Sequence, residues 1–218
     1  MRPVPDVDLT TLARGWGWKL EQAQHFPQVR AIAESRGAVA VYQDAGRQDW
    51  HAGWGGWPEH FTKVDTWPVP GTFAAAIAIS DRILPRMDNL MPAMIYRPPT
   101  LTLGIHGDLD ETTVEDLLAS VAEVFVQHQL SVLSLTAIAS TMAFKEHPEL
   151  IDLAENLHIP LLPYPEEKLR QVPTASSNSS PCALAAMLAA GATQTLAAAI
   201  PSGGLTFSIA RRSWAVDK

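Results

Sequence analysis

The order of apolar segments in the second half of the chain constrains the fold more than any other feature of the sequence. Segments typical of buried strands alternate there with segments of helical periodicity. In chain order they are a strand at 100–105, a helix at 113–129, a strand at 132–138, a helix at 148–157 and a strand at 159–163. This alternation predicts a parallel sheet with right-handed crossover helices.

The last part of the chain predicts one more helix and a hairpin. An alanine-rich helix is expected at 182–190, because Gly191 supplies the left-handed residue that commonly ends a helix. Two strands, 195–200 and 205–211, flank a Pro-Ser-Gly-Gly turn. The second half is therefore expected to form a mostly parallel sheet with helices on both faces and a terminal hairpin.

A pair of prolines separates this regular half from a less regular one. Pro98 and Pro99 lack amide donors and favour extended geometry, so we expect two small α/β domains, 1–97 and 98–218. The elements expected in the first are helices at 7–13 and 26–35 and strands at 38–42 and 73–80. Between those strands, the tryptophan-rich segment 49–71 is expected to be a long loop or a hairpin.

Composition argues against several classes of function. The 218 residues are 47% hydrophobic, as expected of a chain that forms a core. A single cysteine excludes an internal disulfide and a cysteine-cluster metal site. It also favours a reducing compartment, the cytoplasm. The net charge of −7 argues against a nucleic-acid partner, because phosphate neutralisation needs clustered Lys and Arg. No apolar segment is long enough to predict a membrane span. Residues 101–218 carry the imbalance, with 6 basic and 13 acidic residues, which suggests two separate units.

The segment at the end of the strand 100–105 carries the residues best suited to chemistry. Ligands of open α/β sheets bind at the carboxyl ends of strands, and a loop containing Gly104 and Gly107 would let backbone amides approach a ligand. His106 or Asp108 could act as a general base towards water. The structural alternative is that the acidic residues of 108–111 cap the following helix.

Lys145 and the hairpin are the other candidates for binding. Lys145 is the only Lys or Arg between Leu101 and Glu167, and it either binds an anionic ligand or is an ordinary solvated lysine. The hairpin brings small side chains and hydroxyl groups, for which turn geometry is the alternative explanation. These residues are Ser202, Gly203, Gly204 and Thr206.

The remaining reactive side chains predict no metal site and no cofactor. No two histidines have the HxxxH or HExxH spacing of a zinc site. Cys182 is expected at a helix N-terminus, where a thiol could be activated, but a small apolar residue there more often packs.

The succession of motifs from residue 101 to residue 212 resembles the C-terminal domain of the cobalt-precorrin-5A hydrolase family of cobalamin biosynthesis, a domain that also occurs alone in the aerobic pathway. The matching segments are GIHGDLDETTVEDLL, LTAI, FK, LAENLHIPLLPYPEEKL, PCALAAMLAAG and SGGLTFSIARR. Residues 6–97 resemble the middle region of the same family, through VDLTTLA, AVAVYQ and AAAIAISDR.

This resemblance implies a substrate and a reaction. Enzymes of the family open the ring-A lactone of cobalt-precorrin-5A with water and release acetaldehyde, so the implied ligand is a tetrapyrrole (corrin) intermediate, and any cobalt comes with it. The positions that match the family are Lys145, Gly203, Gly204, Thr206 and Arg211.

Two departures from the family leave other functions open. The family's Gly-Cys-Arg-Arg-Gly run corresponds to 106–110, where this chain has acidic residues, and full-length relatives carry a further N-terminal domain. The alternatives are a noncatalytic corrinoid-binding or carrier module, or an interaction subunit. Such a subunit would use its tryptophan-rich segment to dock on another pathway enzyme, or on a separate protein that supplies the N-terminal domain.

Overall fold

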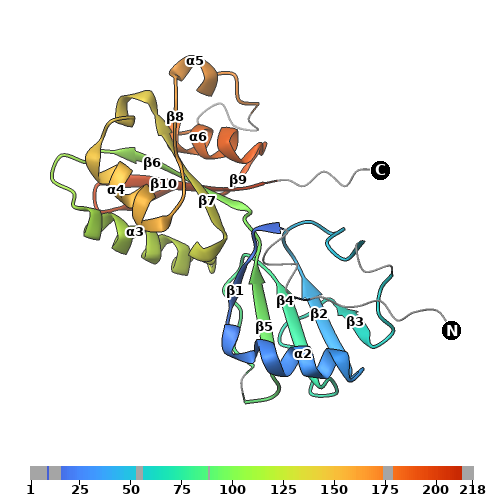
Figure 1. Ribbon diagram of the computed structural model, residues 1–218. Coiled ribbons are helices and arrows are strands. Elements are labelled where there is room, and N and C mark those ends of the chain that lie inside the picture. Colours follow the sequence, from blue (N-terminus) through green and yellow to red (C-terminus); the bar gives the residue numbers. More distant parts are fainter. Residues whose placement is uncertain (1–8, 10–15, 53–55, 88, 174–178, 213–218) are drawn as a thin grey trace. The chain divides into compact units, whose positions relative to one another are not determined.

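The computed structural model describes residues 9, 16–52, 56–87, 89–173 and 179–212 (Figure 1). Contacts divide the chain between Pro99 and Thr100 into two compact units, and there are two five-stranded sheets, one in each unit. The predicted α/β class is confirmed. The helix expected at 7–13 lies almost entirely outside the described residues.

The sheet of the first unit is mostly parallel. Its strands, in spatial order, are β1 (Lys19–Glu21), β5 (Ala93–Arg97), β4 (Ala75–Ile79), β2 (Val39–Gln43) and β3 (Phe61–Val64). The last four run parallel, and β1 pairs antiparallel with β5. Helix α2 (Phe26–Glu34) buries Val29 in the core of this unit. The helix expected at 26–35 and the strands expected at 38–42 and 73–80 are confirmed.

The tryptophan-rich segment contributes a strand and part of the core. β3 lies within it and pairs in parallel with β2, so the hairpin alternative is wrong. Trp50 is buried and Trp57 is half-buried, with ring centroids 5.9 Å apart. The indole N–H of Trp50 donates to Gln43, and that of Trp57 donates to the carbonyl of Phe61. These two tryptophans therefore stabilise the first unit and offer little exposed surface for docking.

The second unit has the element order expected from its sequence. Its strands, in spatial order, are β8 (Leu161–Tyr164), β7 (Leu135–Thr141), β6 (Leu101–Gly107), β10 (Leu205–Arg211) and β9 (Thr195–Ser202). β6, β7 and β8 run parallel, and β10 lies antiparallel between β6 and β9. Gly203 and Gly204 form the turn of the predicted hairpin with φ of 56° and 79°, a conformation that favours glycine.

Helices cover both faces of the second sheet, as predicted (Figure 1). α3 (Val114–Gln127) and α4 (Pro148–Leu157) pack on one face with Leu103 and Phe207. α6 (Pro181–Ala190) packs on the other, where Ala186 and Ala210 share a core cluster. Because side chains alternate along a strand, odd-numbered residues of β6 and β10 face α3 and even-numbered residues face α6. This alternation decides which predicted site residues share a face.

Candidate functional site

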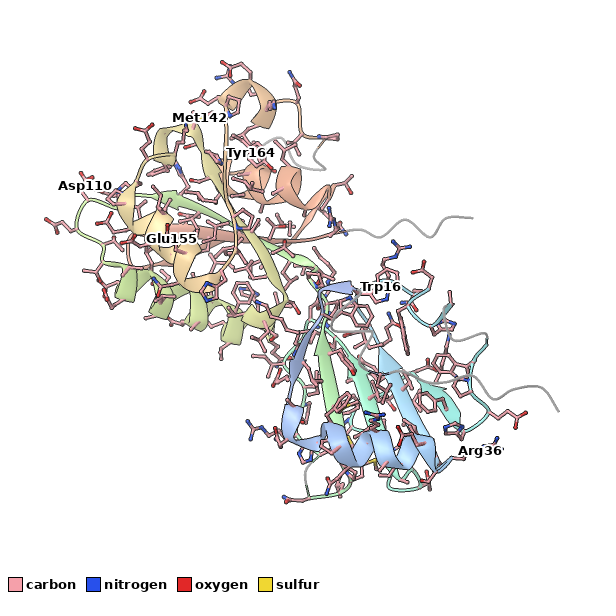
Figure 2. The ribbon with its side chains drawn as sticks, viewed as in Figure 1. Trp16, Arg36, Asp110, Met142, Glu155 and Tyr164 are labelled. Carbon is pink, nitrogen blue, oxygen red and sulfur yellow. The ribbon has the colours of Figure 1, made fainter. Side chains whose placement is uncertain are left out.

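The carboxyl ends of β6, β7 and β8 meet at one edge of the second sheet. The segments that follow them are the β6–α3 connection, the short 3-10 helix Met142–Phe144 and α5 (Glu166–Leu169). Figure 2 shows Asp110, Met142 and Tyr164 at this end of the second unit. The candidate site predicted from the sequence lies at this edge.

His106 is a strand residue at this edge. The loop expected at 104–107 is wrong, because β6 continues to Gly107 and pairs His106 with Thr206 of β10. The half-buried His106 ring lies edge-on to Phe144, with centroids 5.8 Å apart. Its Nδ1 is buried and has no hydrogen-bond partner among the described residues. A ligand or water that reaches this ring would therefore meet Nε2.

The side chains of Thr141 and Tyr164 lie on the same face of the sheet as His106. Gly104 pairs with Ala139 of β7, and two residues further along these parallel strands come His106 and Thr141. Thr141 in turn pairs with Tyr164 of β8. Burial raises the pKa of the Tyr164 phenol, so its hydroxyl stays protonated and can donate. Thr141 and Tyr164 were not among the residues predicted from the sequence, although each is the last residue of a strand whose place in the chain order was predicted.

Lys145 lies at the same edge. It follows Phe144, whose ring contacts His106, and its side chain is exposed. Within the described ranges, no side chain forms an ion pair with Lys145. Asp108 and Asp110 of the β6–α3 connection are also exposed. The role of Lys145 as a ligand for an anion stays a prediction.

Asp108 and its acidic neighbours do not provide the side-chain cap of α3. Asp108 Oδ1 accepts a hydrogen bond from the amide of Asp110 at 3.1 Å, which closes a local turn. The cap is a reciprocal pair, in which Thr113 accepts from the Asp116 amide and Asp116 accepts from the Thr113 amide. The hydrogen bonds from the Thr113 side chain and backbone lower the pKa of Asp116. The role of Asp108 as a base stays a prediction.

Close packing explains the glycines of β6. A Cβ at Gly104 would lie 1.9 Å from the carbonyl oxygen of Cys182, which begins α6. At Gly107, where φ is 140°, a Cβ would lie 2.9 Å from the carbonyl oxygen of Gly204. Both glycines pair with residues of β10. The expected loop of free amides at Gly104 and Gly107 is therefore wrong.

The tip of the hairpin contributes to a pocket over α3. This pocket has a volume of about 420 Å³, and Ser202 and Gly203 form one wall of it. Its charged lining residues are Glu111, Asp116 and Glu123. An acidic pocket does not suit a ligand rich in carboxylates, and the binding role expected of Ser202 and Gly203 stays a prediction.

Arg211 lies at the far end of β10. It pairs with Leu101 at the start of β6, whereas Thr206 pairs with His106 near the end of β6. Arg211 lines a pocket of about 260 Å³ together with Arg212 and Thr193. The structure thus brings His106, Thr206 and Lys145 to one edge and places Arg211 elsewhere.

The described residues hold no cluster of three or more His, Cys, Asp or Glu side chains that could bind a metal ion. Cys182 is buried, with its Sγ 3.1 Å from Ser180 Oγ and 3.3 Å from Ser208 Oγ. These contacts fit the packing role that the sequence favoured. No helix in the described part of the chain is long and apolar enough to cross a membrane.

The second unit is an open α/β sheet with crossover helices, a class of fold in which ligands, where they bind, do so at this edge. Residues 101–210 match the family described as "Cobalamin synthesis G C-terminus". The match spans half of the chain, so the chain belongs to this family, and the resemblance seen in its second half is confirmed. No match was found among curated proteins.

Three solved structures are similar to the chain. One is a protein described as a cobalamin biosynthesis protein G homolog from Sulfolobus solfataricus, with 14% identity and a TM-score of 0.41. The match covers 94% of this chain and 60% of that chain. CobE, a protein of the cobalamin (vitamin B12) pathway, matches 52% of this chain and 91% of its own, with 24% identity and a TM-score of 0.45. Cobalamin biosynthesis protein chiG from Agrobacterium tumefaciens matches 52% of this chain and 99% of its own, with 21% identity and a TM-score of 0.45.

Proposed function

We propose that this chain binds a corrin intermediate of cobalamin biosynthesis at the carboxyl edge of the second sheet and opens its ring-A lactone, the reaction of cobalt-precorrin-5A hydrolases. One observation carries the proposal: at this edge the half-buried imidazole of His106 lies edge-on to Phe144, and the exposed Lys145 follows Phe144 directly. An apolar ring, an acid–base group and a positive charge suit a flat macrocycle that bears carboxylates.

In the proposed reaction, His106 acts on water. Nε2 takes a proton from water as its oxygen bonds to the lactone carbonyl carbon. The bond from that carbon to the ring oxygen then breaks, and the ring oxygen takes the proton back from His106. This leaves a carboxylic acid, which ionises to solvent, and a hydroxyl on the two-carbon fragment. The fragment leaves as acetaldehyde when its carbon–carbon bond to the macrocycle breaks: the hydroxyl gives its proton to water as the carbonyl forms, and the electrons of the broken bond stay on the macrocycle. Water is the only co-reactant.

The proposal predicts both a spectral change and a product. Cobalt-precorrin-5A should shift its visible spectrum when titrated with the protein, and acetaldehyde should accumulate in proportion to enzyme. His106→Gln should keep the spectral shift and lower the rate of acetaldehyde release by about 100-fold, a typical contribution of one acid–base group. His128→Gln is the matched control, because His128 is exposed at the end of α3. An unchanged rate in His106→Gln would remove His106 from the chemistry.

Lys145 provides a separate prediction about affinity. Lys145→Ala should raise the dissociation constant for the intermediate about fivefold, because an exposed charge pair contributes on the order of 1 kcal/mol. Lys145→Arg keeps the charge and should bind within about twofold of the original chain. Spectral titration measures both variants. If Lys145→Ala binds as tightly as the original chain, Lys145 is an ordinary surface lysine.

The same edge supports a second candidate, a noncatalytic corrinoid carrier. The observation that favours it concerns the buried Nδ1 of His106, which has no hydrogen-bond partner among the described residues. The imidazole therefore lacks, at that nitrogen, the second group that usually orients the base of a hydrolase. A carrier would give the full spectral shift with no acetaldehyde, and His106→Gln would then change only the affinity.

A further inference from the structure

The first sheet has its own ligand-binding edge by topology. From β2 the chain continues to β3 on one side, whereas from β4 it continues to β5 on the other. The connections therefore diverge at the carboxyl ends of β2 and β4, which are neighbours in the sheet. Open parallel sheets bind ligands at such switch points. None of the functional residues predicted from the sequence lies at this switch point.

Arg82 and Asp44 meet at this point. Arg82 follows β4 and Asp44 follows β2, and Arg82 Nε lies 3.3 Å from Asp44 Oδ2. The hydroxyl of Tyr42 donates to the same oxygen at 3.2 Å. The side chain of Arg82 is 51% exposed, and the printed contact with Asp44 is made through Nε. Half of the Arg82 side chain is therefore open to solvent at this switch point.

A buried arginine holds the backbone of Arg82. Arg97 is 2% exposed and donates hydrogen bonds to the carbonyls of Ser80 and Arg82, while its Nε donates to Glu21 at 2.6 Å. The amide of Arg82 donates to the hydroxyl of Ser80 at 3.0 Å. These bonds fix the turn after β4 before any ligand arrives, as pre-organised binding sites require.

An aromatic pair lies beside this charge cluster. The rings of Tyr42 and Trp67 are half-buried and 6.1 Å apart, and the Trp67 indole donates to the carbonyl of Pro85 at 2.8 Å. Burial, and then the charge and hydrogen bond of Asp44, raise the pKa of Tyr42. Tyr42 therefore remains a hydroxyl donor that holds Asp44 in place.

We propose that Arg82, with the Tyr42–Trp67 pair, forms a second binding site in the first unit, for a planar apolar group that carries a carboxylate. An exposed guanidinium can donate two hydrogen bonds to the two oxygens of a carboxylate, and the aromatic pair offers apolar surface to the attached ring. This inference does not rest on the proposed function, because it uses only residues of the first unit.

Three small probes separate the parts of the proposed ligand. Benzoate carries both a ring and a carboxylate, acetate carries only the carboxylate, and benzyl alcohol carries only the ring. Benzoate should shift the NMR resonances of the Trp67 indole N–H and the Arg82 Nε–H in a saturable way, and it should bind about tenfold more tightly than either other probe. If benzoate shifts neither resonance, or binds no better than acetate, the proposal is wrong.

Substitutions then locate the site. Arg82→Gln should weaken benzoate binding about tenfold, and Arg82→Lys about threefold, because lysine keeps the charge and loses the fork. Arg36→Gln is the control, since Arg36 (labelled in Figure 2) lies between α2 and the start of β2, whereas Arg82 follows the carboxyl end of β4. Unchanged thermal midpoints in all three variants show that the fold is intact. Equal weakening in Arg36→Gln, or no weakening in Arg82→Gln, would overturn the proposal.

Discussion

Replacing Gly104 with alanine should destabilise the second unit by about 3 kcal/mol, the upper end of the usual cost of overpacking. The added Cβ would lie 1.9 Å from the carbonyl oxygen and 2.7 Å from the carbonyl carbon of Cys182. Both atoms belong to the backbone at the start of α6, so no side-chain rotation can relieve the clash. The helix must move away from β6 and lose part of its packing on the sheet.

Native-state amide hydrogen exchange of β6 and β10 measures this cost for the second unit alone. Gly191→Ala is the matched control: its φ of 63° costs a non-glycine residue about 1–2 kcal/mol, but a Cβ there would meet open space. Cys182→Ala should not rescue Gly104→Ala, because the obstructing oxygen remains. Rescue by Cys182→Ala, or equal costs at Gly104 and Gly191, would contradict this explanation.

Replacing Arg97 with methionine should destabilise the first unit by about 3 kcal/mol, because several hydrogen bonds from one charged group are lost together. The variant would leave the carbonyl oxygens of Ser80 and Arg82 without this donor and Glu21 without its partner. Urea unfolding followed by tryptophan fluorescence reports on this unit, because Trp18 and Trp50 are buried in its core.

Two further variants test the cause of that loss. Arg97→Lys should recover part of the stability, since one ammonium cannot reach all three acceptors with the geometry of a guanidinium. Glu21→Gln should cost less than Arg97→Met, because the Glu21 side chain is 33% exposed and water can replace part of the interaction. A cost below about 1 kcal/mol for Arg97→Met would show that the network contributes little net stability.

The second unit was predictable from sequence because its strands and helices carry their own local patterns. β6, β7 and β8 are apolar runs separated by helices of clear periodicity, and glycines mark the hairpin turn. β5 was missed because it ends in Arg97, a charge that is buried through Glu21, 76 residues away in sequence. No local pattern reveals a partner so distant.

The sequence predicted the edge of the sheet at which the candidate site lies better than it predicted the individual residues of that site. The rule that ligands bind at carboxyl ends of strands located His106 and Lys145 correctly on one edge. Arg211 was grouped with them because it matches the family, yet its position in β10 sets it at the other end of the sheet. Gly104 looked like part of a binding loop, because the close approach of the Cys182 carbonyl exists only in the folded chain.

The antiparallel placement of β10 between β6 and β9 has a consequence for how the second unit folds. The residues that β10 pairs with on β6 precede it by roughly 100 positions. During synthesis, β6 and β7 can associate early, but β6 keeps one unpaired side until the ribosome has released β10. That open strand is the point at which a nascent or truncated chain would be most exposed to aggregation.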